Sequence, residues 1–111
     1  MNKKELAELD RWLTEKMGWE YPHYIEISCE GPGYQVYESR KFMPTRRIEQ
    51  AWLPLEKVIG DGHEGATPMI YFSSGSWWCR LSGLGTAHGA AEPEEAICLA
   101  VKEAWEKGGE K

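Results

Sequence analysis

The stretch Pro93 to Lys107, PEEAICLAVKEAWEK, has the clearest helical pattern in the chain. Pro93 suits the first position of a helix, because the first N–H groups of a helix have no partner within it. Glu94 and Glu95 place negative charge at the positive end of the helix dipole, and Lys107 places positive charge near the other end. Apolar and small residues share one broad face at helical spacing: Ala96, Ile97, Cys98, Ala100, Val101, Ala104 and Trp105. This pattern predicts a helix that lies close against a sheet.

Length and charge limit what the chain can be. Its 111 residues are enough for one domain with its own core, without a metal or a disulfide. The net charge of −5 disfavours general binding to nucleic acid or to an anionic membrane. No apolar run has the length of a membrane span, and the charged start MNKKELAELD is not typical of a signal peptide. We therefore expect a cytoplasmic protein without a membrane partner.

The three cysteines are Cys29, Cys79 and Cys98. An odd number without close spacing is a poor basis for a disulfide framework, so we predict three free thiols. Each cysteine lies in an apolar pattern, where a free cysteine usually acts as a small core residue.

Two further helices are predicted. The first runs from Asn2 to Met17, with Asn2 as N-cap, Glu5 completing a capping box and Gly18 ending the helix. The second opens at Pro44, with Thr45 as its cap, and carries an apolar stripe of Ile48, Trp52, Leu55 and Ile59. Pro54 lies within this second helix.

Four strands are predicted in two hairpins. The first hairpin pairs His23–Cys29 with Tyr34–Glu38 across a turn at residues 30–33. The second pairs Met69–Phe72 with Trp77–Leu81 across a turn at residues 73–76. The segments at residues 60–65 and 83–91 are predicted to be a loop and a glycine-rich connection.

The second hairpin decides the predicted architecture. Adjacent strand residues point to opposite faces, and both Met69–Phe72 and the pair Trp77 and Trp78 are apolar or aromatic throughout. Both faces therefore carry bulky apolar groups, which favours helices on both sides. We expect an α/β (α+β) fold, a three-layer α/β/α sandwich around one four-stranded antiparallel sheet with three helices, in a single domain spanning residues 1–111. The alternative is that one face is exposed aromatic surface.

Three segments are similar to a known family. They are LDRWLTEKMGW at Leu9 to Trp19, FMPTRRIEQAW at Phe42 to Trp52, and EPEEAICLAVKEAW at Glu92 to Trp105. In this order they resemble the phage ABA sandwich domain family, small proteins of phages and prophages. The resemblance implies an α/β/α sandwich in the cytoplasm of a host bacterium. It implies no activity and no functional residues. Arg46 and Arg47 depart from the family, which tends to have an acidic residue after the capping threonine.

The glycine-rich stretch Gly83 to Gly89 lies between a strand and a helix, where a phosphate loop would be. Its spacing matches neither standard glycine fingerprint, and no lysine follows. The carboxylates of Glu92, Glu94 and Glu95 would repel a phosphate at this helix start. We therefore predict a flexible connector and no cofactor.

Metal and acid–base chemistry have little support. His23, His63, His88 and the cysteines do not fall at zinc-type spacing. His63 and His88 have carboxylates nearby, but no serine or cysteine is placed as an obvious nucleophile. We predict no catalytic residues and no metal site.

Arg40, Lys41, Arg46 and Arg47 form the only dense group of basic residues, here called the basic cluster. Positive charge in the first turn of a helix is unfavourable, so the cluster could serve a partner outside the fold. A solvated surface is the alternative, because charged groups on surfaces are weakly constrained. We predict a non-enzymatic accessory protein of a phage or prophage that binds another protein. The alternative is a nucleic-acid-associated protein that uses the basic cluster.

Overall fold

The computed structural model describes residues 2–60, 68–81 and 88–108, with the backbone alone for residues 27–31 and 34–37. These residues form a mixed α+β fold with three helices and two antiparallel sheets. In chain order the elements are α1 (Lys3–Lys16), β1 (Tyr24–Gly31), β2 (Tyr34–Lys41), α2 (Ile48–Gly60), β3 (Pro68–Ser73), β4 (Ser76–Leu81), β5 (His88–Ala90) and α3 (Pro93–Gly108).

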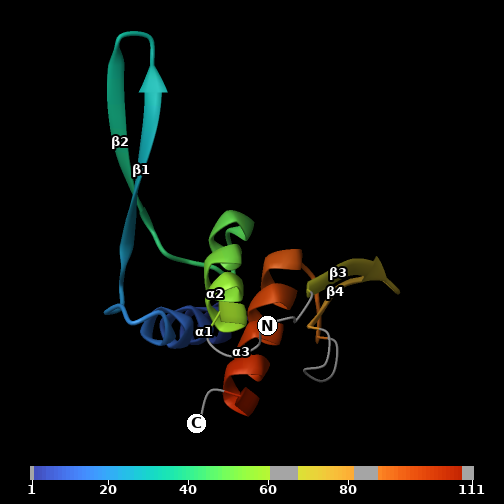
Figure 1. Cartoon of the computed structure of the whole chain (residues 1–111). Helices are drawn as coiled ribbons and strands as arrows, with labels where there is room; N and C mark the ends of the chain where they lie inside the picture. The colour runs from blue at the N-terminus through green and yellow to red at the C-terminus, as the bar shows by residue number, and fades with distance from the viewer. Residues whose placement is uncertain (1, 61–67, 82–87, 109–111) are drawn as a thin grey trace.

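Helix α3 is the centre of the molecule. It packs against α2 on one side and against β4 and β5 on the other, as Figure 1 shows. Its broad apolar face is buried as predicted: Ala96, Ile97, Cys98, Ala100, Val101, Ala104 and Trp105. Burying a branched aliphatic side chain contributes about 1.5–3 kcal/mol, so the fully buried Ile97 and Val101 each stabilise the core substantially.

Helix α1 follows its predicted signals closely. The backbone N–H of Glu5 donates to Asn2 Oδ1 at 2.9 Å, and Gly18 has a φ of +85° just after the helix. Only glycine adopts such a φ at little cost, which is why the helix ends there. Trp12 joins α1 to α3 through an edge-to-face contact with Trp105, with ring centroids 6.2 Å apart.

Helix α2 begins at Ile48, later than the predicted opening at Pro44 with Thr45 as cap. Pro44, Thr45 and Arg46 instead form a turn, in which Arg46 N–H donates to the Met43 carbonyl at 3.0 Å. Thr45 is therefore not the helix cap. Its own N–H donates to the side chain of Asp10 in α1 at 3.0 Å.

The hairpin of β1 and β2 forms a sheet of its own. Its register runs from Tyr24 opposite Lys41 to Gly31 opposite Tyr34, so both strands are longer at one end than predicted. The hairpin extends away from the three helices (Figure 1). The prediction of one four-stranded sheet is thus wrong, because the two hairpins do not pair with each other.

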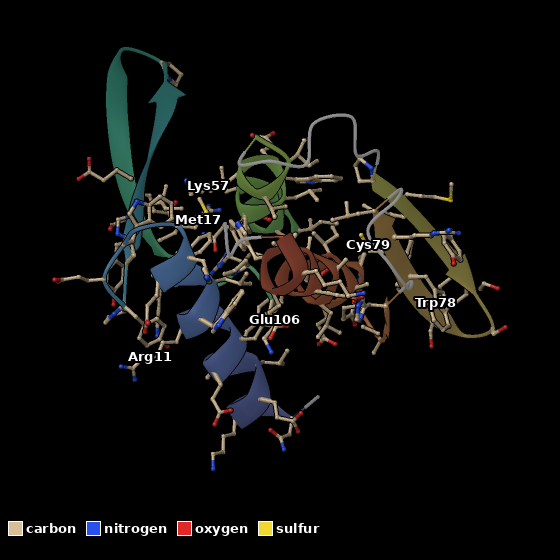
Figure 2. The ribbon with its side chains drawn as sticks, turned by 60° about the horizontal axis from the view of Figure 1, so that its bottom comes forward. Arg11, Met17, Lys57, Trp78, Cys79 and Glu106 are labelled. Carbon is tan, nitrogen blue, oxygen red and sulfur yellow. The ribbon has the colours of Figure 1, made fainter. Side chains whose placement is uncertain are left out.

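The second sheet has the order β3–β4–β5. Strand β5 comes from the glycine-rich connection and pairs with Trp77–Cys79 of β4, which occupies the edge that a four-stranded sheet would have needed. Helix α3 covers one face of this sheet, and Cys79 lies in the buried layer between them (Figure 2).

The opposite face of this sheet has no helix packed on it among the residues that the structure describes. Met69 on that face is 58% exposed. Within the described ranges, the three-layer sandwich is therefore wrong for this sheet, and the alternative of an exposed face holds, with Tyr71 37% exposed beside Met69. Trp77 and Trp78 lie on opposite faces because neighbouring strand residues alternate.

Candidate functional site

The basic cluster has internal partners that the sequence did not indicate. Arg40 Nη2 lies 3.3 Å from Glu38 Oε2, so its charge is partly balanced within β2. The Lys41 ammonium lies 5.1 Å from the ring centroid of Tyr21, a cation–π distance. Arg46 is exposed in the turn before α2, whereas Arg47 is partly buried.

Two of the four positive charges of the basic cluster act on Asp10. Its side chain is only 2% exposed and accepts a hydrogen bond from Thr45 N–H. Burial raises the pKa of Asp10, and hydrogen bonding from Thr45 and the positive charges of Arg46 and Lys41 oppose this rise. Two members of the basic cluster thus stabilise a buried carboxylate, which gives them a structural role.

The sequence pattern held a signal for Asp10. Counting along α1, Asp10 lies four residues after Leu6 and three before Leu13, so it shares the apolar stripe. A carboxylate at such a position is rarely left without a partner. Which partner it would find was not readable, because Thr45 is 35 residues away.

The histidines described by the structure have structural contacts. His23 stacks on Trp19 with centroids 4.1 Å apart. His88 Nε2 contacts Glu103 Oε2, which links β5 to α3. Within α3, Lys107 Nζ donates to Glu103 Oε1 at 2.6 Å. His63 and residues 83–87 of the glycine-rich stretch lie outside the described residues.

Two of the predicted free thiols are observed. Cys79 and Cys98 are free and buried. Burial raises the pKa of Cys79 to about 11 and that of Cys98 well above its ordinary value, so neither is a reactive thiolate at neutral pH. The side chain of Cys29 lies outside the described residues. No group of three or more potential metal-ligating side chains converges within residues 2–60, 68–81 and 88–108.

A shallow cleft of about 330 Å³ separates α1 from α3. It is lined by Glu5, Glu8, Leu9, Trp12, Leu99 and Lys102. Lys102 and Lys16 lie 5.7 Å and 5.3 Å from the Trp12 ring centroid. Both lysines thus lie at a cation–π distance from the Trp12 ring. The residues that line the cleft include no nucleophile paired with a base.

The bare face of the three-stranded sheet has the most distinctive arrangement. Trp78 is held in place there: its indole N–H donates to the Ser73 carbonyl at 2.9 Å, and its ring covers Gly89 so closely that a Cβ at Gly89 would lie 3.0 Å from it. Tyr71 is directly opposite Trp78 in the register. Met69 is directly opposite Arg80.

We call Met69, Tyr71, Trp78 and Arg80 the sheet-face patch. All four belong to β3 and β4 on the face away from α3, and Figure 2 shows this sheet at the margin of the molecule. Arg80 is the only Asp, Glu, Lys or Arg in β3, β4 and β5. The patch is thus apolar and aromatic with one positive charge, and the sequence runs Met69–Phe72 and Trp77–Trp78 were its signal.

None of the helices in the described ranges is both long and apolar enough to cross a membrane. Comparisons with protein-family models, curated proteins and solved structures find no significant match to this chain. The resemblance to the phage ABA sandwich domain family therefore rests only on the three segments that suggested it.

Proposed function

We propose that this chain is a non-enzymatic protein-interaction module and that the sheet-face patch is its binding surface. The observation that carries the proposal is Trp78, which is held by Ser73 and packs on Gly89, on a face that no helix of the described residues covers. A side chain already held in one conformation loses little entropy when a partner binds. Tryptophan, tyrosine and arginine are also the residues most enriched at the energetic centres of interfaces.

The composition of the patch indicates the chemistry of its partner. Met69, Tyr71 and Trp78 favour a protein surface with apolar side chains at its centre. Arg80 lies among them and would best meet a carboxylate, because an arginine can bind both carboxylate oxygens at once. The proposed partner is a protein with an apolar surface that includes an Asp or Glu.

A nucleic-acid partner was the alternative, through the basic cluster. Proteins that bind single strands combine stacked aromatic rings with several Lys or Arg along the backbone path. The patch has only Arg80, and in the basic cluster Arg40 pairs with Glu38 while Lys41 and Arg46 act on Asp10. These contacts favour the protein partner. A phage or prophage origin remains a proposal that rests on the sequence resemblance.

The test is a pull-down from lysate of the native host, quantified by mass spectrometry. Trp78→Ala and Arg80→Glu are the patch variants, and Trp52→Ala is the matched control because Trp52 is a partly exposed tryptophan on α2. A partner bound by wild type and by the control, but lost by both patch variants, supports the proposal. A partner retained by both patch variants contradicts it.

A separate experiment tests the nucleic-acid alternative. Arg46→Glu/Arg47→Glu and wild type are compared in salt-titrated gel shifts with single- and double-stranded DNA and RNA. We expect no shift for either protein at physiological salt. A salt-dependent shift that the double variant loses would favour the nucleic-acid function instead.

A further inference from the structure

The outer edge of β3 has the features of a strand that pairs with another chain. Strand β3 is at the end of the order β3–β4–β5, and no strand of the described chain pairs with its other edge. Natural proteins protect long edges with charges, internal prolines or bulges. Strand β3, Pro68–Ser73, has six residues without a charge, and its proline stands only at the first position, where it is tolerated.

The hairpin turn determines which backbone groups face that edge. Ser74 and Gly75 have φ values of 54° and 78°, as in the two-residue type I′ turn, and Ser73 faces Ser76 across it. The two residues that close such a turn form a hydrogen-bonded pair, in which each N–H donates to the C=O of the other residue. Hydrogen-bonded and non-hydrogen-bonded pairs then alternate along the two strands. Met69 and Tyr71 therefore pair with β4, while Ile70 and Phe72 direct their N–H and C=O groups to the open edge.

We propose that β3 pairs antiparallel with β3 of a second copy of this chain, around a two-fold axis at Tyr71. In this register the N–H and C=O groups of Ile70 face those of Phe72 in the second copy. By symmetry, the same groups of Phe72 face those of Ile70 in the second copy. The two Tyr71 side chains meet on the outer face as a close cross-strand pair. The two three-stranded sheets become one six-stranded antiparallel sheet. The inference shares Tyr71 with the sheet-face patch, but it concerns the open backbone edge of β3 and does not rest on the proposed function.

Charge and exposure favour a second copy as the occupant. Two chains of net charge −5 repel each other in general, but the strands of this sheet have no acidic residue and only Arg80 is charged, one strand away from the edge. No like charges meet in the proposed pair. Phe72 is 60% exposed although it lies on the α3 side of the sheet. In the proposed register it gains Ile70 of the second copy as an apolar neighbour.

The first test introduces a charged side chain at the two-fold axis. Wild type is expected to dimerise in sedimentation velocity as its concentration rises from micromolar to near-millimolar. Tyr71→Lys places two lysines opposite each other, and Tyr71→Glu two glutamates, so each alone should dimerise more than about tenfold more weakly. An equimolar mixture should form a one-to-one heterodimer. A monomeric wild type, unaffected single variants, or a mixture that stays monomeric would each overturn the proposal.

The second test separates backbone pairing from side-chain contact. Phe72→Pro removes the N–H that faces the open edge, whereas Phe72→Ala removes only the ring. We expect the proline variant to lose the dimer and the alanine variant to retain most of it, with native far-ultraviolet circular dichroism and one thermal transition in both. Equal weakening by the two changes would show that the backbone of β3 does not form the interface.

Discussion

Asp10 shows how one residue can decide the local course of the chain. Its carboxylate accepts the N–H of Thr45, which ties the turn at residues 44–46 to α1. Burying the ionised form costs free energy, which hydrogen bonding from Thr45 and the charges of Arg46 and Lys41 offset only in part, because the pKa of Asp10 remains raised.

The sign of the raised pKa gives a test. Below the unfolded value of 3.8 the carboxyl is protonated in both states and costs nothing. Between 3.8 and the higher folded value the carboxyl ionises more readily in the unfolded chain, so the stability falls as the pH rises, and the loss is complete above the folded value. Asp10→Asn does not titrate, so urea unfolding at several pH values should show this variant gaining stability relative to wild type from acid to neutral pH. A difference that is constant with pH would contradict this.

Asp10→Ala provides the matching control. It leaves the buried N–H of Thr45 without its acceptor, so it should destabilise the protein by about 1–3 kcal/mol at neutral pH. If Asp10→Ala were as stable as wild type, the hydrogen bond to Thr45 would not matter to the fold.

Gly89 and Trp78 make a second residue-scale test. The φ of Gly89 is not in the left-handed region, so the effect of a side chain there is steric. Gly89→Ala places a methyl group against the Trp78 ring and should cost about 1–3 kcal/mol in chemical denaturation. In a Trp78→Ala background the cost should vanish.

Gly60→Ala is the control for this pair, because a Cβ at Gly60 meets nothing within 4 Å. It should leave the stability unchanged or raise it by up to about 1 kcal/mol. An equal cost for Gly89→Ala with and without Trp78 would show that the ring does not occupy that space.

At the scale of elements, β5 depends on its attachment to α3. It has three residues, and His88 is fastened to Glu103, whose side chain is only 17% exposed and also binds Lys107. His88→Ala should lower the free energy of unfolding by about 1–2 kcal/mol, because it removes a partly buried hydrogen-bonded partner. Hydrogen exchange should show faster exchange in β4 and β5.

An exposed ion pair serves as the comparison. Arg11 and Glu15 are 68% and 59% exposed, so Arg11→Ala should change the stability by no more than about 0.5 kcal/mol. If the two substitutions had equal effects, the His88 contact would be no more than another surface pair.

The helices were predictable where their signals are local. The Asn2 cap, the Gly18 stop and the apolar face of α3 are each encoded within a few residues, and all are confirmed. The predicted start of α2 was wrong because residues 44–46 form a turn, in which the Arg46 N–H donates to the Met43 carbonyl. The Thr45 N–H binds Asp10, 35 residues away, a contact that local sequence does not encode. Strand β5 was missed because HGA has no alternation and no β-branched residue.

The candidate site was predictable only in outline. The aromatic runs of β3 and β4 were visible in the sequence, but the bare face depends on how many helices reach the sheet, which periodicity does not encode. The basic cluster was visible too. Glu38, which pairs with Arg40, is two residues away on the same strand, whereas Tyr21 and Asp10 approach the cluster only through the tertiary fold.

At the scale of the whole molecule, the two sheets differ in how they relate to the core. The β3–β5 sheet shares buried residues with α3, whereas β1 and β2 contact mainly each other. The base of their hairpin is held by Phe42, which is fully buried, lies edge-to-face against Trp19 and donates its N–H to the His23 carbonyl at 2.8 Å.

The far part of this hairpin should therefore be dispensable for folding. Ile27 and Glu38 face each other in the register, so residues 28–37 can be replaced by Asn-Gly, the dipeptide that best suits a two-residue turn. The shortened chain keeps the base of the hairpin, and its calorimetric Tm should stay within about 5 °C of wild type. Phe42→Ala should instead cost about 3–5 kcal/mol, because it empties a buried site at that base. A shortened chain that unfolds more than about 10 °C lower would show that the far part of the hairpin, and not only its base, stabilises the core.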